Sequence, residues 1–238
     1  MNGQTLPPVR TTHVWRAPGG LWCYDTWGKH GRPIVLIPAV LFDRVMWWPA
    51  AAELRAHATV VAVDLPGHGA STRRHRYNPY ELVDDLAELV HHLGVQRAPV
   101  VIGHASAAPL ATLFATQYPV HAVVIVDPPD TPHPPAQPTE YLSDLGLDAI
   151  PACYRDMVTP STDAGLLAAY ASCTDAGPAR GWASAVAQPA RLAVHSQTPP
   201  RHTTRPADQW RHEIYDVAGR FAHLTDLHRF ARDVRALL

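Results

Sequence analysis

Short apolar runs alternate with amphipathic segments along most of this chain. Residues 9–16 and 21–27 predict two strands of a β-hairpin, because Pro18-Gly19-Gly20 between them is typical of a turn. Other short apolar runs stand between polar, proline or glycine residues and predict further strands. These strands are residues 33–37, 59–64, 98–102, 120–126, 191–195 and 213–217.

Helical periodicity is clearest over residues 80–93, where apolar side chains recur on one face and Gly94 provides a C-terminal stop. Further helices are predicted over residues 46–57, 107–118 and 225–238. Strands that alternate with helices predict a mostly parallel sheet of an α/β protein, covered by helices on both faces.

Residues 128–188 break this alternation. They open with a proline-rich run and continue with short helical patches, so they are interpreted as a helical cap inserted over the C-terminal edge of the sheet. An unpacked surface loop is the alternative, but large apolar residues favour a packed cap. Among these residues are Tyr141, Leu142, Ile150, Tyr154 and Trp182. Residues 1–127 and 189–238 would then form the core domain.

Composition narrows the function classes. The 238-residue chain has a formal net charge of -1 and a sequence pI near 6.9, which disfavour nucleic acid and anionic membranes as partners. No apolar run approaches the roughly 18 residues of a membrane span, and residues 1–10 lack the apolar core of a signal peptide. Three widely spaced cysteines show no metal-binding pattern, so a cytoplasmic protein without a metal is expected.

Four short motifs follow one another along the chain: residues 34–38 (IVLIP) with Trp47, residues 63–71 (VDLPGHGAS), residues 102–107 (IGHASA) and residues 218–223 (AGRFAH). In these motifs the chain resembles the α/β-hydrolase family. The resemblance implies an eight-stranded, mostly parallel α/β-hydrolase sheet, an inserted helical cap and chemistry that needs no cofactor. It also implies a nucleophile elbow, a sharp strand-to-helix turn with the nucleophile at its tip.

Steric crowding fixes the register of this elbow, because only small residues fit two positions before and two after the tip. A tip at Ala105 has Gly103 and Ala107 in these positions, whereas a tip at Ser106 would put His104 where a small residue is needed. The tip is therefore Ala105, which has no nucleophilic atom. Either an engineered change replaced a serine, or the protein works without that nucleophile. A shifted nucleophile at Ser106 is a third option, but Ser106 is better interpreted as a helix N-cap or first-turn hydroxyl.

The family resemblance implies that His223 is the general base, and His228 is expected at the surface. The family's usual acid position, within residues 193–199, holds no carboxylate. Some members place the acid after the strand that precedes the cap, where Asp127 stands. Asp127 would orient His223, unless it only caps the strand end; the weaker candidates are Asp130, Asp208 and Asp216.

By position, the backbone N–H groups of Val40 and Ser106 would form the oxyanion hole. The His68 loop is interpreted as structural, because proline and glycine shape it. Apolar residues near the elbow and in the cap predict a substrate pocket. The predicted pocket residues are Ala39, Leu41, Phe42, Trp47, Trp48, His104, Tyr141, Tyr154 and Trp182.

These features predict a hydrolase for an ester or lactone of a hydrophobic small molecule, with a Ser-His-Asp-type mechanism disabled by Ala105. Two alternatives stay open: a lyase or cyclase that uses His223 without an acyl-enzyme, and an inactive ligand-binding protein. The expected partner is the small-molecule substrate, and the chain is expected to be a monomer or homodimer.

Overall fold

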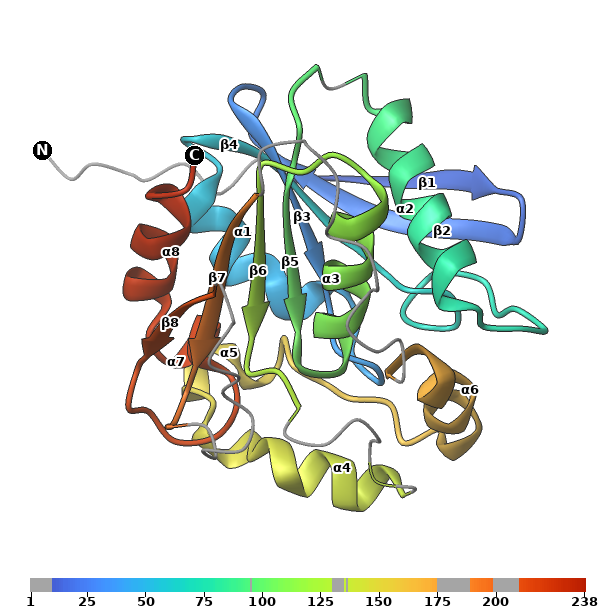
Figure 1. The fold of residues 1–238 in the computed structure, drawn as a ribbon. Coiled ribbons are helices and arrows are strands. Elements are labelled where there is room, and N and C mark those ends of the chain that lie inside the picture. Colours follow the sequence, from blue (N-terminus) through green and yellow to red (C-terminus); the bar gives the residue numbers. More distant parts are fainter. Residues whose placement is uncertain (1–9, 95, 130–134, 136, 175–188, 199–209) are drawn as a thin grey trace, which may run out of the picture.

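The computed structural model describes residues 10–94, 96–129, 135, 137–174, 189–198 and 210–238. Within these residues, eight strands form one sheet in the order β1-β2-β4-β3-β5-β6-β7-β8 (Figure 1). The strands are β1 (Arg10–Ala17), β2 (Gly20–Trp27), β3 (Arg32–Ile37), β4 (Ala58–Val63), β5 (Val100–His104), β6 (Ala122–Val126), β7 (Ala190–His195) and β8 (Arg211–Ile214).

The sheet is antiparallel only at its N-terminal edge, where β1 pairs with β2 and β2 pairs with β4. The strands from β4 through β3, β5, β6 and β7 to β8 run parallel. The predicted fold class is therefore confirmed. The last strand begins two residues and ends three residues earlier than predicted; Asp216, just beyond it, adopts a positive φ of 56° and turns the chain.

The main helices are α1 (Trp48–Leu54), α2 (Pro79–His92), α3 (Ala108–Gln117) and α8 (Leu227–Arg235). Helices α2 and α3 pack together on one face of the sheet, while α1 and α8 pack together on the other (Figure 1). The side chain of Asn78 accepts a hydrogen bond from Tyr80 N and so starts α2, with proline in the first turn.

One predicted helix is divided in two, and the predicted C-terminal helix, residues 225–238, follows a separate short helix. The segment predicted as residues 46–57 begins with the 3-10 helix η1 (Arg44–Trp47), which is followed by α1 with Pro49 in its first turn. The C-terminal segment contains α7 (Ala222–Thr225) and then α8, because the Asp226 side chain accepts a hydrogen bond from Arg229 N and starts a new helix.

The segment predicted as the cap contains α4 (Pro138–Leu145), η3 (Leu147–Ala149), α5 (Ala152–Arg155) and α6 (Ala164–Thr174). Helices α4 and α6 lie beyond the C-terminal ends of β5 and β6 (Figure 1). Apolar side chains of this segment are buried; they include Tyr141, Leu145, Ile150, Leu166 and Leu167. The segment therefore covers the sheet edge at which the elbow lies, and its predicted end at residue 188 falls outside the described residues.

The hydrophobic core fills both sides of the sheet. Its largest fully buried side chains include Trp22, Trp27, Trp47, Phe221 and Phe230. None of the described helices combines the length and apolarity that a membrane span requires.

Candidate active site

The elbow connects β5 to α3 through the 3-10 helix η2 (Ala105–Ala107). Ala105 lies at the tip with a positive φ of 44°, and its exposed fraction is 3%. A Cβ atom built on Gly103 would lie 2.5 Å from the Ala107 carbonyl oxygen, so this position accepts only glycine. The structure thus places Ala105 at the tip, as the crowding argument predicts.

The positive φ of Ala105 is strained for a residue with a side chain. Such a conformation costs on the order of 1–3 kcal/mol and persists only where the surrounding structure enforces it. Serine at this position would use the strain to aim its hydroxyl group at a substrate. Alanine keeps the same backbone conformation without that group.

His223, on α7, is fully buried beside the elbow. The centroid of its ring lies 4.3 Å from that of Trp47 and 4.8 Å from that of His104. Neither ring nitrogen has a hydrogen-bond partner among the described residues. Burial holds the pKa of His223 well below its usual 6.5, and the neighbouring His104 lowers it further. His223 is therefore a neutral base at pH 7.

Asp127, at the end of β6, does not hydrogen-bond to His223. Its Oδ1 accepts a hydrogen bond from Ser196 N at 2.6 Å, and its Oδ2 accepts from Ser196 Oγ at 2.8 Å and Ala222 N at 3.1 Å. Burial raises the pKa of Asp127, and these hydrogen bonds oppose that rise. The carboxylate therefore holds the backbone next to His223 instead of its ring.

Sequence reasoning missed Ser196, because it sought a carboxylate in this segment and not a partner for Asp127. No described carboxylate hydrogen-bonds to the His223 ring. Of the weaker acid candidates, Asp216 is exposed, while Asp130 and Asp208 lie outside the described residues. His228 is exposed, as expected.

The predicted oxyanion hole is occupied by side chains of the protein itself. Val40 N donates a hydrogen bond to Ser106 Oγ at 2.9 Å, and Ser106 Oγ lies 2.8 Å from the Tyr141 hydroxyl oxygen on α4. Ser106 is thus not a helix N-cap, because its side chain contacts Val40 N and Tyr141 on α4, but it does lie in the first turn after the strand, within η2. Val40 N–H is not a free donor in this structure.

His68 positions the loop that carries Val40. Its Nε2 accepts a hydrogen bond from Leu41 N at 2.9 Å, and Leu41 adopts a positive φ of 73°. Asp64 holds the neighbouring backbone segments in place through an ion pair with Arg44 and through hydrogen bonds from Arg44 N and Ala70 N. The structural interpretation of the His68 loop is confirmed, because His68 holds Leu41 N.

Five of the predicted pocket residues are buried close to the elbow: Ala39, Leu41, Phe42, Trp47 and His104. His104 Nε2 donates to the Arg220 carbonyl oxygen at 2.7 Å, and Phe42 packs edge-on against Phe221. Tyr141 reaches the elbow through its hydroxyl group.

Trp48 and Tyr154 were predicted at the same pocket, but they line a separate cavity of about 520 Å³. Its other lining residues include Arg10, Trp27 and Met157, and no elbow residue. Trp48 follows Trp47 directly, so its side chain leaves the helix in another direction and donates to Asp25. Trp182 lies outside the described residues.

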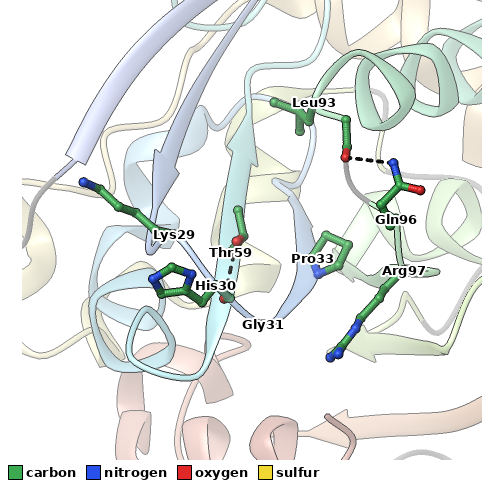
Figure 2. Close-up of a pocket in the computed structure, with 9 residues that line it drawn as sticks. Lys29, His30, Gly31, Pro33, Thr59, Leu93, Gln96 and Arg97 are labelled. Carbon is green, nitrogen blue, oxygen red and sulfur yellow. Dashed lines mark hydrogen bonds between the residues drawn. The ribbon is translucent and has the colours of Figure 1, made fainter.

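A further cavity of about 500 Å³ lies where β3 and β4 begin, at the sheet edge opposite the elbow (Figure 2). Lys29, His30 and Arg97 are among its lining residues. Thr59 Oγ1 donates to the His30 carbonyl oxygen at 3.4 Å across it. The cavity lies at the N-terminal ends of these parallel strands, whereas the elbow follows the C-terminal end of β5.

Buried neutral histidines make stability depend on pH. Burial lowers the pKa values of His68 and His104 to about 4, whereas both titrate near 6.5 in the unfolded chain. The unfolded state thus binds more protons below pH 6.5, so stability is full above that pH and falls toward pH 4. From pH 7 to 4.5, each histidine should remove about 2 kcal/mol from the free energy of unfolding, measured by urea denaturation.

Single substitutions separate these contributions. His104→Gln should lose less stability between the two pH values than the native chain, while His228→Gln, at an exposed position, should behave like the native chain. An unchanged pH dependence in His104→Gln would contradict the assignment.

The sequence model described as "Alpha/beta hydrolase family" matches residues 34–236. This chain belongs to the alpha/beta hydrolase family. It is 32% identical over 131 residues to the magnesium-chelatase 30 kDa subunit of Rhodobacter capsulatus, covering 52% of this chain and 46% of that protein. The chain spans less than half the length of the curated relatives it matches.

Solved structures with the alpha/beta hydrolase fold cover nearly the whole chain. One is AqDC, a protein that recognises and ring-cleaves the Pseudomonas quinolone signal, with a TM-score of 0.74, 20% identity, and coverage of 94% of this chain and 99% of that one. Another is a thermophilic esterase from Thermogutta terrifontis, with a TM-score of 0.72, 19% identity, and coverage of 95% and 97%. At these identities the likeness shows the fold.

Proposed function

We propose that this alpha/beta hydrolase binds a hydrophobic ester or lactone at the elbow, and that position 105 is the place of the nucleophile in an acyl-transfer mechanism which Ala105 disables. The positive φ of 44° at Ala105 carries the proposal. This backbone conformation is costly for alanine, and at a nucleophile elbow it serves to aim a nucleophilic side chain.

The surrounding groups suit the same chemistry. A serine hydroxyl at position 105 would attack the substrate carbonyl carbon, and its proton would pass to neutral His223, which is buried beside the elbow. The leaving alcohol would take that proton, and water would hydrolyse the acyl-enzyme with His223 again as base. The apolar surroundings of His223, formed by Trp47, Phe221 and Phe230, favour a hydrophobic substrate.

Ala105→Ser tests the proposal through labelling with a fluorophosphonate, which reacts with activated serines. The variant should be labelled at the introduced serine, and the native chain should not be labelled there. In the double variant with His223→Gln, labelling should fall strongly because the base is lost. A folded Ala105→Ser protein that resists labelling would refute acyl transfer at this elbow.

His223 favours a second candidate, in which the native chain acts as a non-hydrolytic catalyst. Its ring nitrogens have no partner among the described residues, and Asp127 binds the backbone beside it. A neutral, unpartnered base could remove a proton from a bound substrate without an acyl-enzyme. AqDC, which shares the fold, is described as a ring-cleaving protein and not as an esterase.

Proton abstraction by the native chain can be measured with nitrobenzisoxazole, an apolar probe whose ring opens when a base removes its C–H proton. The native chain should open the ring faster than His223→Gln, by about 100-fold, the lower end of what a positioned base contributes. Equal rates in the two proteins would exclude His223 as a base toward apolar ligands.

A further inference from the structure

The hydroxyl groups of Ser106 and Tyr141 form a buried chain of hydrogen bonds at the elbow. Val40 N donates to Ser106 Oγ at 2.9 Å, and Ser106 Oγ lies 2.8 Å from Tyr141 Oη. The exposed fractions of Ser106 and Tyr141 are 3% and 6%. The contact joins the elbow to α4, so two segments far apart in the sequence complete one polar cluster.

A count of protons shows that this cluster is incomplete. The two hydroxyl groups carry two hydrogens, but only one hydrogen can lie between the two oxygens. Among the described residues, no further acceptor lies within hydrogen-bond distance of either oxygen. One O–H group therefore has no acceptor among the described residues, and leaving it so in a buried site costs about 1–3 kcal/mol.

Either hydroxyl group could donate in the Ser106–Tyr141 contact, and we infer that Ser106 donates, which leaves Tyr141 with the free hydrogen. Ser106 Oγ already accepts from Val40 N–H, and it can pass its own hydrogen to Tyr141 Oη. Both the hydroxyl and the backbone N–H of Ser106 lower the pKa of Tyr141, as donors to the phenol oxygen do. Burial nevertheless raises that pKa to about 12, so the phenol keeps its hydrogen at neutral pH.

A second observation at the same site points to a ligand. The ring of His223 is fully buried next to the elbow, and both of its nitrogens lack partners among the described residues. Unsatisfied polar groups therefore occur at two places next to the elbow, one at the Ser106–Tyr141 contact with α4 and one on α7. Buried polar groups are nearly always paired, so two such groups around one strained residue indicate a binding site for a compound with polar atoms of its own.

We propose that Tyr141 is the oxygen-binding residue of this site: its hydroxyl group, supported by Ser106 and Val40 N–H, donates a hydrogen bond to the carbonyl oxygen of an uncharged, apolar ligand. This inference rests on the proposed function and deepens it, because it names the donor that replaces a free Val40 N–H in the oxyanion hole. Donors linked in a chain polarise one another, which strengthens the last hydrogen bond. The positive charge of Arg220, close enough to lower the pKa of Tyr141, further favours negative charge on the ligand oxygen.

The test uses the native chain and two fluorescent probes. One is propionyl-dimethylaminonaphthalene, an aryl ketone whose emission shifts to longer wavelength when its carbonyl accepts a hydrogen bond. The other carries a propyl group in place of the propionyl group and has no carbonyl. Tyr141→Phe should bind the ketone about 3- to 10-fold more weakly than the native chain, with emission at shorter wavelength, and should bind the propyl compound equally well.

Tyr154→Phe is the matched control, because Tyr154 lines the separate cavity and should not affect either probe at the elbow. Unchanged or stronger ketone binding by Tyr141→Phe would overturn the proposal, and stronger binding would show that the phenol merely blocks the site. Equal weakening for both probes would indicate a structural role. Failure of the native chain to bind the ketone would also refute it.

This measurement separates the inference from the function on which it rests. If Ala105→Ser resists labelling while Tyr141→Phe still weakens ketone binding, acyl transfer fails and the oxygen-binding role stands. If Ala105→Ser is labelled while Tyr141→Phe binds the ketone like the native chain, the oxygen-binding role alone fails.

Discussion

Ester hydrolysis by the Ala105→Ser variant should exceed that of the native chain by about 100-fold. In a serine protease, removal of the nucleophile lowers kcat by about a million-fold, which sets the upper limit for restoring one. Loss of the correct aspartate contact to histidine costs about ten thousand-fold in another, unrelated serine protease. Here Asp127 binds Ser196 and Ala222 N, not the His223 ring. We therefore expect the introduced serine to raise the rate by far less than this upper limit.

The rate should be measured with a nitrophenyl ester of a short fatty acid, because its leaving group needs little protonation. Ala105→Gly is the matched control, since glycine tolerates the positive φ but supplies no nucleophile. Ala105→Ser should hydrolyse the ester in a burst that matches the enzyme concentration, while Ala105→Gly should equal the native chain. Equal rates for all three proteins would show that the site lacks acyl-transfer chemistry.

Gly103→Ala should lower the free energy of unfolding by about 3 kcal/mol, the upper part of the range for overpacking a buried site. The added Cβ would lie 2.5 Å from the Ala107 carbonyl oxygen and 2.9 Å from Ala111 Cβ. Backbone atoms of the elbow cannot move aside without displacing η2 and α3. Urea denaturation measures the loss, and near-ultraviolet circular dichroism checks that the protein still folds.

Gly94→Ala is the matched control for this prediction. Gly94 has a positive φ of 64°, but no atom lies within 4 Å of a Cβ built there. This substitution should cost about 1 kcal/mol, from backbone conformation alone. If Gly103→Ala were no more destabilising than Gly94→Ala, the elbow would not be crowded, and the argument that places its tip at residue 105 would lose its physical basis.

The fold could be predicted from the sequence because its signals are local. Alternating apolar runs and helical periodicity each depend on residues within one element, and the elbow depends on neighbours two positions apart. The boundaries that differed were set by single residues with special backbone roles, such as Asp216 with its positive φ and Asp226 as the start of α8.

The site was less predictable, since its contacts join distant segments. Asp127 and Ser196 are 69 residues apart, and Ser106 and Tyr141 are 35 apart. Sequence position suggested that Asp127 would orient His223 and that Val40 N–H would be free. Val40 N–H instead donates to the Ser106 hydroxyl group, and Asp127 accepts hydrogen bonds from Ser196 and from Ala222 N. A serine in either segment gives no periodic signal that would reveal such a partner.

The sequence by itself determined the sheet, the elbow and the absence of a nucleophile at its tip, because crowding by Gly103, Ala107 and His104 acts between near neighbours. Only the tertiary structure decided how the polar groups around Ala105 are paired. A hydrogen bond depends on the distance and direction between atoms that folding brings together. The structure therefore showed that Ser106 and Tyr141 occupy the predicted oxyanion hole, and that the His223 ring has no hydrogen-bond partner among the described residues.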